Sequence, residues 1–438
     1  MGMFFGTDGI RGVVNDGLTF DLAYKCGNAI GATKENPIIV VGGDTRQTRS
    51  FLASAIAGGA MAAGANVIDI GVCPTAGIAY ITKNIKADFG VVISASHNPA
   101  EYNGIKIFDG NGIKLNEAKE ESLEQRFINQ VNKNWNDLGK YTQDFDLVQA
   151  YEDYLVECCQ TDLSGLKIVL DCSNGASYKV APNVFKRLGA TIIEEYCDKD
   201  GEINYQCGSL YPQNICDLVK QHNADIGFAF DGDSDRVIAC DENGTIVDGD
   251  VIIYILGNYL KTQGKLAKNI VVGTRHTNMG IEKALKDKGI RLIRTDIGDK
   301  YVIAKIEEDG LSLGGEKSGH IIFRELSTTG DGILTALKVA ELVKSVNKSL
   351  SEISKVQLYP QINVDCVVKD KVRIINSEQL QREITAQEKF LGENSRIMVR
   401  VSGTEPKIRI MCESKNIKKC ITATKCIEKT IEEINQLS

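Results

Sequence analysis

Residues 37–94 contain three short apolar runs: PIIVVGGD at 37–44, ANVIDIG at 65–71 and ADFGVVIS at 87–94. Helical stretches separate these runs, and the first of them extends from about Ser50 to Ala63. Runs of β-branched residues that alternate with helices are typical of βαβ units, in which a largely parallel sheet is buried on both faces. The segment therefore predicts an α/β domain near the amino end of the chain.

The same alternation returns twice further along the chain. LKIVLDCSNGA and ATIIEEY (166–176 and 190–196) begin a second unit, and KNIVVGTRH, IRLIRTD and LSLGGEKSGHIIF (268–276, 290–296 and 311–323) belong to a third. The tail changes character, because 356–368 and 395–414 read as antiparallel strands before a final helix. We expect four domains, with soft boundaries, at 1–150, 151–246, 247–360 and 361–438.

Composition excludes several classes of protein. The 438 residues carry a net charge of -7, so no overall basic field favours nucleic acid or an anionic membrane. No apolar run is long enough to span a bilayer, and the start of the sequence is unlike a signal peptide, which predicts a cytoplasmic protein. The thirteen cysteines contain no CxxC pair, which favours reduced, mostly buried thiols over a zinc site or a disulfide framework.

Three aspartates lie between two apolar strands in FAFDGDSDRVIAC (228–240), at positions 231, 233 and 235. Alternating carboxylates in a tight turn can direct several oxygens to one hard cation, so Asp231, Asp233 and Asp235 predict a Mg²⁺ site. A calcium EF-hand is disfavoured because Arg236 stands where its loop needs glycine and because strands flank the segment. A plain acidic turn remains the alternative.

A serine-rich loop follows the strand at 87–93, with the sequence SASHNP (94–99). Ser, Asn and Pro are ordinary turn residues, so a plain turn is one interpretation. A serine hydrolase is disfavoured, since no GxSxG elbow surrounds the hydroxyl. Together with a metal site, a serine that carries a phosphate is the better hypothesis, and Lys106 could neutralise charge or act as an acid or base.

Four further glycine-containing stretches offer groups that bind ligands. In GGEKSGH (314–320) the side chains of Glu316, Ser318 and His320 suit sugar hydroxyls, although a plain loop would have the same composition. In RVSGTEPKIR (400–409) two guanidiniums, two hydroxyls and a glycine suit a phosphate dianion, with an exposed hairpin turn as the alternative. The residues concerned are Arg400, Ser402, Gly403, Thr404 and Arg409. FFGTDGIRGVV (4–14) adds Arg11, and GGDTRQTRS (42–50) adds Arg46 and Arg49.

These stretches, in this order, resemble the α-D-phosphohexomutase superfamily over essentially the whole chain. FGTDGIRG, GGEKSGH, TGDGILTAL and RVSGTEPKIR are most similar to its glucosamine-phosphate branch. The resemblance implies three similar α/β domains with mixed, largely parallel sheets and a C-terminal α+β domain, arranged around a central cleft. It also implies an isomerase that interconverts glucosamine 6-phosphate and glucosamine 1-phosphate through glucosamine 1,6-bisphosphate, and so supplies UDP-N-acetylglucosamine for peptidoglycan. A homodimer is common in this group.

The family's site residues fall on matching positions of this sequence. The phosphoserine falls on Ser96, and Mg²⁺ would be shared between its phosphate and the three aspartates. His97 and Lys106 match positions near the transferred phosphoryl, Arg236 follows the metal loop, and Arg11 matches the family's amino-terminal active-site arginine. Residues 316–320 match the sugar loop, and residues 400–409 match the distal phosphate loop.

Departures from the family pattern concern sugar selectivity. Lys317 stands where Gln is more usual, Lys300 replaces an Arg, and Arg275 with His276 replace apolar or small residues. A phosphomannomutase/phosphoglucomutase is therefore the alternative within the superfamily. A binding protein that has lost catalysis is a further alternative, which the intact Ser96 and aspartates disfavour.

Overall fold

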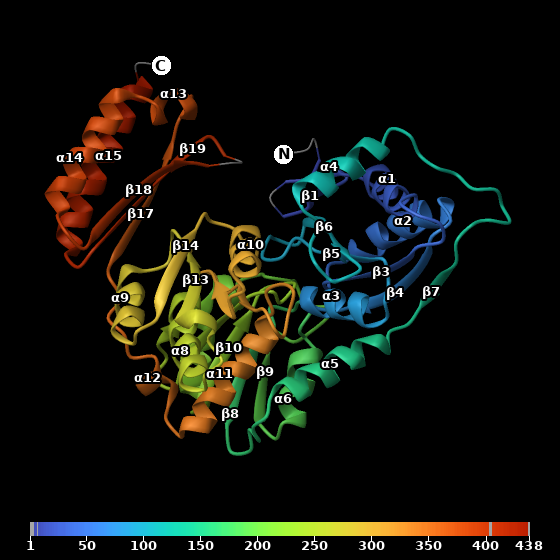
Figure 1. Ribbon diagram of the computed structural model, residues 1–438, viewed down its shortest axis with the longest axis horizontal. Helices are drawn as coiled ribbons and strands as arrows, with labels where there is room; N and C mark the ends of the chain where they lie inside the picture. The colour runs from blue at the N-terminus through green and yellow to red at the C-terminus, as the bar shows by residue number, and fades with distance from the viewer. Residues whose placement is uncertain (1–3, 7, 403–404, 437–438) are drawn as a thin grey trace. The chain divides into compact units, whose positions relative to one another are not determined.

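The computed structural model describes residues 4–6, 8–402 and 405–436 (Figure 1). The chain divides into two units, of which the first comprises Met1–Thr277 and Lys288–Lys355. The second comprises Asn278–Asp287 and Val356–Ser438. Among the described residues, the first unit contains three β-sheets and the second contains one.

The first sheet has seven strands in the order β2-β1-β6-β5-β3-β4-β7. β5, β3, β4 and β7 run parallel, whereas β6 is antiparallel to both β5 and β1. The sheet is therefore mixed, as the resemblance implies. Its strands are β1 (Ile10–Val14), β2 (Gly17–Leu18), β3 (Ile38–Gly43), β4 (Asn66–Val72), β5 (Phe89–Ile93), β6 (Tyr102–Asp109) and β7 (Tyr141–Gln143).

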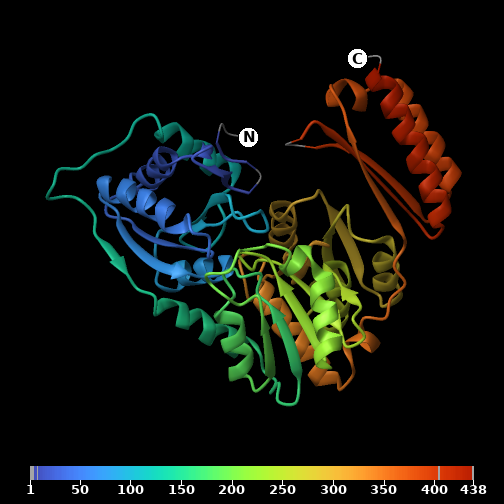
Figure 2. The same cartoon turned by 180° about the vertical axis from the view of Figure 1, so that it is seen from behind.

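Helices cover both faces of this sheet. Figures 1 and 2 show α1 and α2 on one face and α3 on the other. α1 and α2 approach closely because glycines lie between them: a Cβ on Gly27 would come within 2.0 Å of the Ile56 carbonyl oxygen. The helices are α1 (Phe20–Gly31), α2 (Arg49–Ala62), α3 (Thr75–Asn84) and α4 (Glu117–Arg126).

The second and third sheets repeat the α/β pattern. The second has the order β12-β11-β10-β8-β9, and the third has the order β14-β13-β15-β16. In the second sheet β9, β8 and β10 run parallel, and β11 and β12 are each antiparallel to the strand before them. In the third sheet β14, β13 and β15 run parallel, and β16 is antiparallel to β15. The strands are β8 (Lys167–Asp171), β9 (Thr191–Glu195), β10 (Ile226–Phe230), β11 (Val237–Asp241), β12 (Ile246–Val247), β13 (Ile270–Thr274), β14 (Arg291–Thr295), β15 (Leu313–Gly315) and β16 (Ile321–Phe323).

The helices of these two domains alternate with the strands as the sequence predicts. α11 begins at an Asp331 N-cap, whose side chain accepts from the Leu334 N–H. The helices are α5 (Leu147–Cys158), α6 (Val180–Arg187), α7 (Pro212–His222), α8 (Gly249–Thr262), α10 (Asp299–Asp309), α11 (Gly332–Val346) and α12 (Leu350–Ile353), with 3₁₀ turns η1 (Gly208–Leu210) and η2 (Ala267–Asn269).

The second unit is an antiparallel sheet packed on helices. Its order is β17-β19-β18, and its core is the apolar face of α15 against that sheet. The elements are β17 (Gln361–Val367), β18 (Ser395–Val401), β19 (Lys407–Ser414), α9 (Met279–Asp287), α13 (Lys371–Ile375), α14 (Glu378–Leu391) and α15 (Ile417–Gln436). The predicted fold class, three α/β domains followed by an α+β domain, is confirmed.

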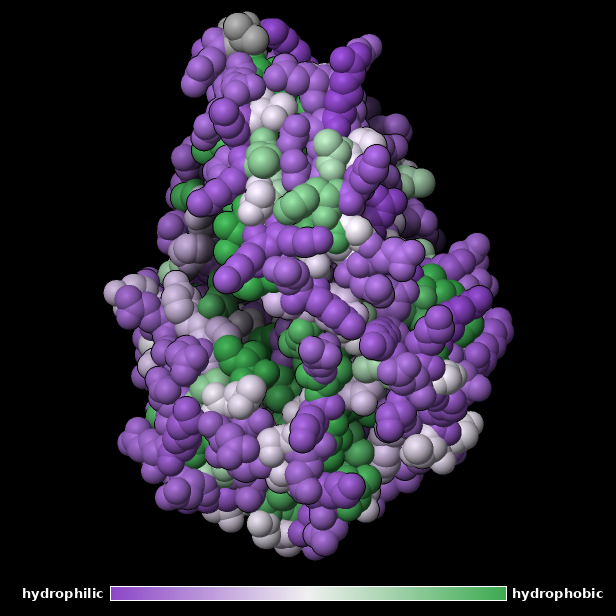
Figure 3. Space-filling view, turned by 90° about the vertical axis from the view of Figure 1, so that its left-hand side faces the viewer, coloured by the Kyte–Doolittle hydropathy of each residue, from purple (hydrophilic) through white to green (hydrophobic). Residues whose placement is uncertain are grey.

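The hydrophilic surface and the burial of most cysteines agree with what the composition predicts. All thirteen cysteines are free thiols, and ten of them are buried. Hydrophilic side chains cover most of the face in Figure 3, with hydrophobic residues between them. Within the described ranges, no helix has the length and apolarity that crossing a bilayer requires.

Candidate active site

The SASHNP loop begins where β5 ends, and it buries its second serine. Ser96 is 1% exposed and has a positive φ of 53°, a conformation that costs a non-glycine residue free energy. Its N–H donates to Ser94 Oγ at 2.8 Å. Its hydroxyl donates to Asp231 Oδ2 at 2.5 Å, which brings the predicted phosphate carrier to the predicted metal site.

The three aspartates lie in the turn between β10 and β11, and each is buried. One oxygen from each falls within 4.8 Å of the other two. Burial, together with the charges of Asp235 and Asp233, raises the pKa of Asp231 well above its usual value. Asp233 Oδ1 and Asp235 Oδ1 are buried without a hydrogen-bond partner among the described residues. Unsatisfied, mutually repelling carboxylate oxygens are the donor set that Mg²⁺ prefers, so the residues fit the ion.

Lys106 projects from β6 into this cluster and is 2% exposed. Its Nζ lies 2.8 Å from Asp233 Oδ2, 3.4 Å from Asp235 Oδ2 and 3.3 Å from Asp8 Oδ2. Burial alone would lower the pKa of Lys106, but Asp233 and Asp8 raise it well above the usual range. The side chain is therefore held as a cation, which favours charge neutralisation over the role of a base.

His97 and Arg236 lie on the other side of the serine hydroxyl. His97 Nδ1 is 3.3 Å from Ser96 Oγ and 3.0 Å from Arg236 Nη1. Burial and the charges of Arg236 and Arg11 lower the pKa of His97 to about 4, so the imidazole is neutral at pH 7. Arg11 contacts Asn98 Oδ1 of the same loop at 3.5 Å. The structure thus gathers two guanidiniums, a neutral imidazole and an ammonium around Ser96.

The loop at 314–320 packs directly against the aspartate turn. The Val237 N–H donates to the Gly319 carbonyl at 3.2 Å, and His320 Nε2 lies 3.9 Å from Asp235 Oδ2. Both ring nitrogens of the buried His320, and the hydroxyl of Ser318, lack a hydrogen-bond partner among the described residues. Glu316 Oε1 accepts from the Gly298 N–H at 3.0 Å. These groups lie beside the cluster and can accept or donate hydrogen bonds to a ligand.

In the second unit, the predicted phosphate loop connects β18 and β19. Arg400 stands directly opposite Arg409 in the antiparallel register. Burial and the neighbouring Arg409 charge lower the pKa of Arg400. Arg409 Nη2 donates to Glu405 Oε2 at 2.7 Å, and the Ser402 N–H donates to the Lys407 carbonyl at 2.9 Å. Two adjacent guanidiniums favour an anion between them. Gly403 and Thr404 lie outside the described residues.

Several residues at the site were not predicted from sequence. Asp8 pairs with Arg11, Lys114 and Lys106. Burial would raise the pKa of Asp8, but these three cations lower it well below its usual value. Asn204 and Arg46 contact the backbone of the serine loop. From the sequence, Arg46 is only a cation that follows a strand, and no local motif marks Asn204.

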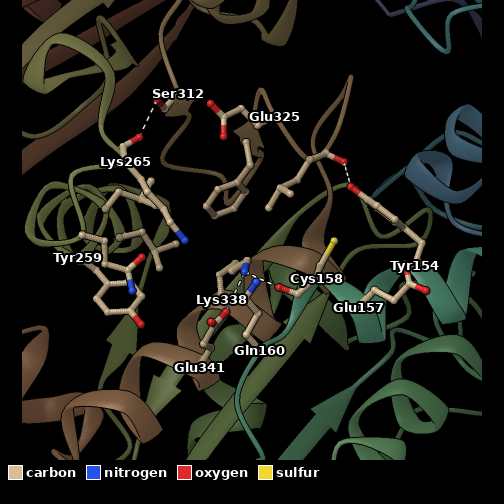
Figure 4. A pocket seen from close by; sticks show the side chains of 15 residues that line it. Tyr154, Glu157, Cys158, Gln160, Tyr259, Lys265, Ser312, Glu325, Lys338 and Glu341 are labelled. Carbon is tan, nitrogen blue, oxygen red and sulfur yellow. Dashed lines mark hydrogen bonds and ion pairs between the residues drawn. The ribbon is translucent and has the colours of Figure 1, made fainter.

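A separate cavity of about 380 Å³ opens beside α5, α8 and α11 (Figure 4). Its lining includes Tyr154, Tyr259 and Lys338, and contains none of the predicted site residues. Lys338 Nζ donates to the Cys158 carbonyl at 2.6 Å and to Glu341 Oε2 at 2.8 Å, so its charge is already paired. The predicted chemistry therefore belongs to the Ser96 cluster and not to this cavity.

Four phosphoglucomutase/phosphomannomutase family models match the chain: alpha/beta/alpha domain I at residues 2–134, domain II at 148–244, domain III at 248–359 and the C-terminal domain at 362–420. The phosphoglucosamine mutase of Alkaliphilus oremlandii is 45% identical over 99% of both chains. The chain belongs to this family, and within it to the phosphoglucosamine mutases.

Solved structures show the same fold. A phosphoglucomutase/phosphomannomutase family protein from Burkholderia thailandensis has a TM-score of 0.83 at 23% identity, covering 98% of this chain and 97% of that one. The N-acetylphosphoglucosamine mutase of Aspergillus fumigatus, solved with GlcNAc-6P and magnesium, has a TM-score of 0.67 at 16% identity, covering 99% and 96%. Similarity at these identities shows the fold, and the roles of individual residues stay predictions.

Proposed function

We propose that the protein interconverts glucosamine 6-phosphate and glucosamine 1-phosphate, with Ser96 as the phosphate carrier. The observation that carries this proposal is the 2.5 Å hydrogen bond from Ser96 Oγ to Asp231 within a buried acidic triplet. Phospho-Ser96 would give its phosphoryl group to the free hydroxyl of the substrate. The resulting glucosamine 1,6-bisphosphate would then return its other phosphate to Ser96 Oγ, so that each turnover regenerates the phosphoenzyme.

Asp231, Asp233 and Asp235 would hold Mg²⁺, as supported by their two unpartnered oxygens and by the magnesium in the Aspergillus structure. When bound, the ion supplies positive charge that stabilises the transferring phosphoryl group. The chain's own cations would do the same from other directions. Lys106 contacts Asp233, Arg236 contacts His97 and Arg11 contacts Asn98. Fixed charges of this kind cost no reorganisation during the reaction.

The two remaining loops would bind the rest of the substrate. Glu316, Ser318 and His320 would bind sugar hydroxyls, because their polar atoms lie beside the acidic triplet. Arg400, Ser402 and Arg409, with Gly403 and Thr404, would bind a phosphate group of the substrate. Phosphate presents similar oxygens at either end of the sugar, so a loop that recognises charge can serve both orientations.

A comparison of kcat/KM between amino-sugar and neutral-sugar phosphates tests this function. We expect kcat/KM for glucosamine 1-phosphate to exceed that for glucose 1-phosphate by about a hundredfold, or roughly 2.7 kcal/mol of transition-state binding. The assay follows formation of each 6-phosphate with Mg²⁺ and a trace of the matching bisphosphate. Equal values, or a preference for glucose or mannose phosphates, would instead support the phosphomannomutase/phosphoglucomutase alternative.

The phosphate role of the hairpin gives a second prediction. Replacing Arg400 with glutamine removes one of two facing guanidiniums, and we expect KM for the phosphosugar to rise about tenfold, since a charged hydrogen bond contributes about 1.5 kcal/mol. Steady-state kinetics measures this. Arg382→Gln is the matched control, because Arg382 is an exposed cation of the same unit paired with Glu378. If both substitutions changed KM equally, general loss of charge and not a phosphate contact would explain the effect.

A further inference from the structure

The backbone carbonyl of Ser96 accepts two hydrogen bonds from two different domains. Arg46 Nη2 donates to it at 3.0 Å from the end of β3, and Asn204 Nδ2 donates at 2.9 Å from the segment that follows β9. Both lone pairs of this carbonyl oxygen are therefore used by side chains. The hydroxyl of the same residue is held by Asp231, so Ser96 is fixed at both its backbone and its side chain.

Arg46 is the donor from the domain that carries the loop. Its side chain is fully buried, and its Nε donates to Asp44 Oδ2 at 3.0 Å. The guanidinium also donates to the carbonyl of Asn98 at 2.7 Å and to that of Pro99. One buried, ion-paired side chain thus binds three backbone carbonyls of the serine loop, those of residues 96, 98 and 99.

Asn204 is the donor from the domain that carries the aspartates. It is 9% exposed, has a φ of 60°, and donates to the Asn98 carbonyl at 3.0 Å as well as to Ser96. Its own N–H donates to the Ser173 carbonyl at 3.0 Å, at the end of β8. Asn204 therefore connects the second sheet to the loop that carries the nucleophile.

The groups around the contact between Asn204 and the Ser96 carbonyl are closely packed. A Cβ on Gly232, between the first two aspartates, would come 2.6 Å from the Ser96 carbonyl oxygen and 2.8 Å from Asn204 Nδ2. The acidic turn, the Asn204 amide and the serine carbonyl are thus in direct contact. Because Ser96 has a positive φ, its conformation needs such contacts to persist.

We propose that Asn204 is a positioning residue for phosphoryl transfer. It holds the Ser96 carbonyl so that Ser96 Oγ stays aligned with the acidic turn at 231–235, which lies in the same domain as Asn204. The inference rests on the proposed function, since the aligned group is the phosphate carrier. Displacements of about 1 Å at a reacting atom reduce rates by up to roughly a hundredfold. Asn204 touches no reacting atom, so its effect should fall on turnover and not on substrate binding.

The test compares Asn204→Gly and Asn204→Asp in the full-length protein. Glycine removes the amide and tolerates the positive φ, whereas aspartate keeps the shape but sets a carboxylate against two carbonyl oxygens. We expect kcat to fall about tenfold for glycine and about a hundredfold for aspartate, with KM within about twofold of the wild-type value. A single-turnover measurement, in which enzyme phosphorylated on Ser96 reacts with glucosamine 6-phosphate, should show the same ranking.

Asn174→Gly is the matched control. Asn174 is also 9% exposed with a φ of 50°, lies in the same domain and donates its amide to a backbone carbonyl, that of Glu202. Among the described residues, the Asn174 side chain makes no hydrogen bond to the serine loop, so its loss should lower stability and leave kcat within about twofold.

Two outcomes would overturn the positioning role. One is that both Asn204 variants keep wild-type kcat; the other is that kcat falls equally in Asn174→Gly, which would indicate general loosening of the domain. Wild-type protein without mutase activity would overturn the proposed function itself. Active wild-type enzyme with unaffected Asn204 variants would overturn only the role of Asn204.

Discussion

Replacing Ser96 with alanine is expected to lower mutase turnover by about four orders of magnitude or more, since the phosphate would lose its covalent carrier. The added mass of roughly 80 Da that a phosphoserine gives should be present on a fraction of wild-type molecules and absent from the variant. Steady-state kinetics and intact mass spectrometry measure the two effects.

Ser96→Gly is a second variant at this position. Because Ser96 has a positive φ, the glycine variant should lose activity to the same extent as Ser96→Ala while avoiding the backbone strain of alanine.

Ser94→Ala is the control for the serine loop. Ser94 is fully buried two residues earlier, and its hydroxyl donates to Asp44 and accepts from the Ser96 N–H. Its removal should lower turnover only through the position of the loop, and the phosphoserine mass should remain. If Ser96→Ala retained wild-type activity, or if the added mass lay on Ser94, the proposed mechanism would be wrong.

Replacing Asp233 with asparagine is expected to abolish the response of the protein to Mg²⁺. Asp233 Oδ1 is one of two oxygens at the acidic triplet that lack a hydrogen-bond partner in the described part of the chain. Asp233 Oδ2 binds Lys106 and accepts from Thr75 Oγ1 at 2.7 Å. In the wild type, Mg²⁺ at a hundred times its Kd should stabilise the fold by about 2.7 kcal/mol, and so raise Tm. In the variant we expect no rise in Tm, and kcat lowered by about a hundredfold or more.

Asp241→Asn separates this effect from ordinary destabilisation. Asp241 is also buried and lies in the same domain, but its carboxylate caps a turn by accepting from the Asn243 and Thr245 N–H groups. The control should lower Tm without Mg²⁺ and keep the rise on adding the ion. An Asp233→Asn protein that still gained stability from Mg²⁺ would place the ion elsewhere.

The fold was predictable because the alternation of strands and helices is a local property of the sequence. Residues 37–94 give β3, α2, β4, α3 and β5, and 395–414 give the β18–β19 hairpin. The central residues of the candidate site are also predicted from the sequence: the aspartates by their spacing after a strand, and Ser96 by its loop together with the family resemblance. The resemblance implies that Ser96 and the aspartates share a site, and the structure adds the direct hydrogen bond between Ser96 and Asp231, which are 135 positions apart.

The supporting residues were not predictable, because their roles depend on distant partners. Asn204 reads as a turn residue, and its contact with the Ser96 carbonyl joins two domains across 108 positions. Asp8 lies in a glycine-rich loop, and its part in the site is apparent only in the structure, where it pairs with Lys106 and Lys114. Lys300, noted as a departure from the family, pairs with Glu117 of the first domain and so has a structural partner.

The antiparallel register of β18 and β19 also limits how this hairpin can change in length. Arg400 and Arg409 are paired across the two strands, so their side chains lie on the same face of the sheet. Along each strand, successive side chains alternate between the two faces. Inserting or deleting one residue between Arg400 and the turn would move the Arg400 guanidinium to the opposite face of the sheet and separate the pair, whereas a change of two residues would return it to the same face. The length of the chain between Arg400 and Arg409, the connecting turn included, is therefore restricted, because it sets the register that pairs the two guanidiniums.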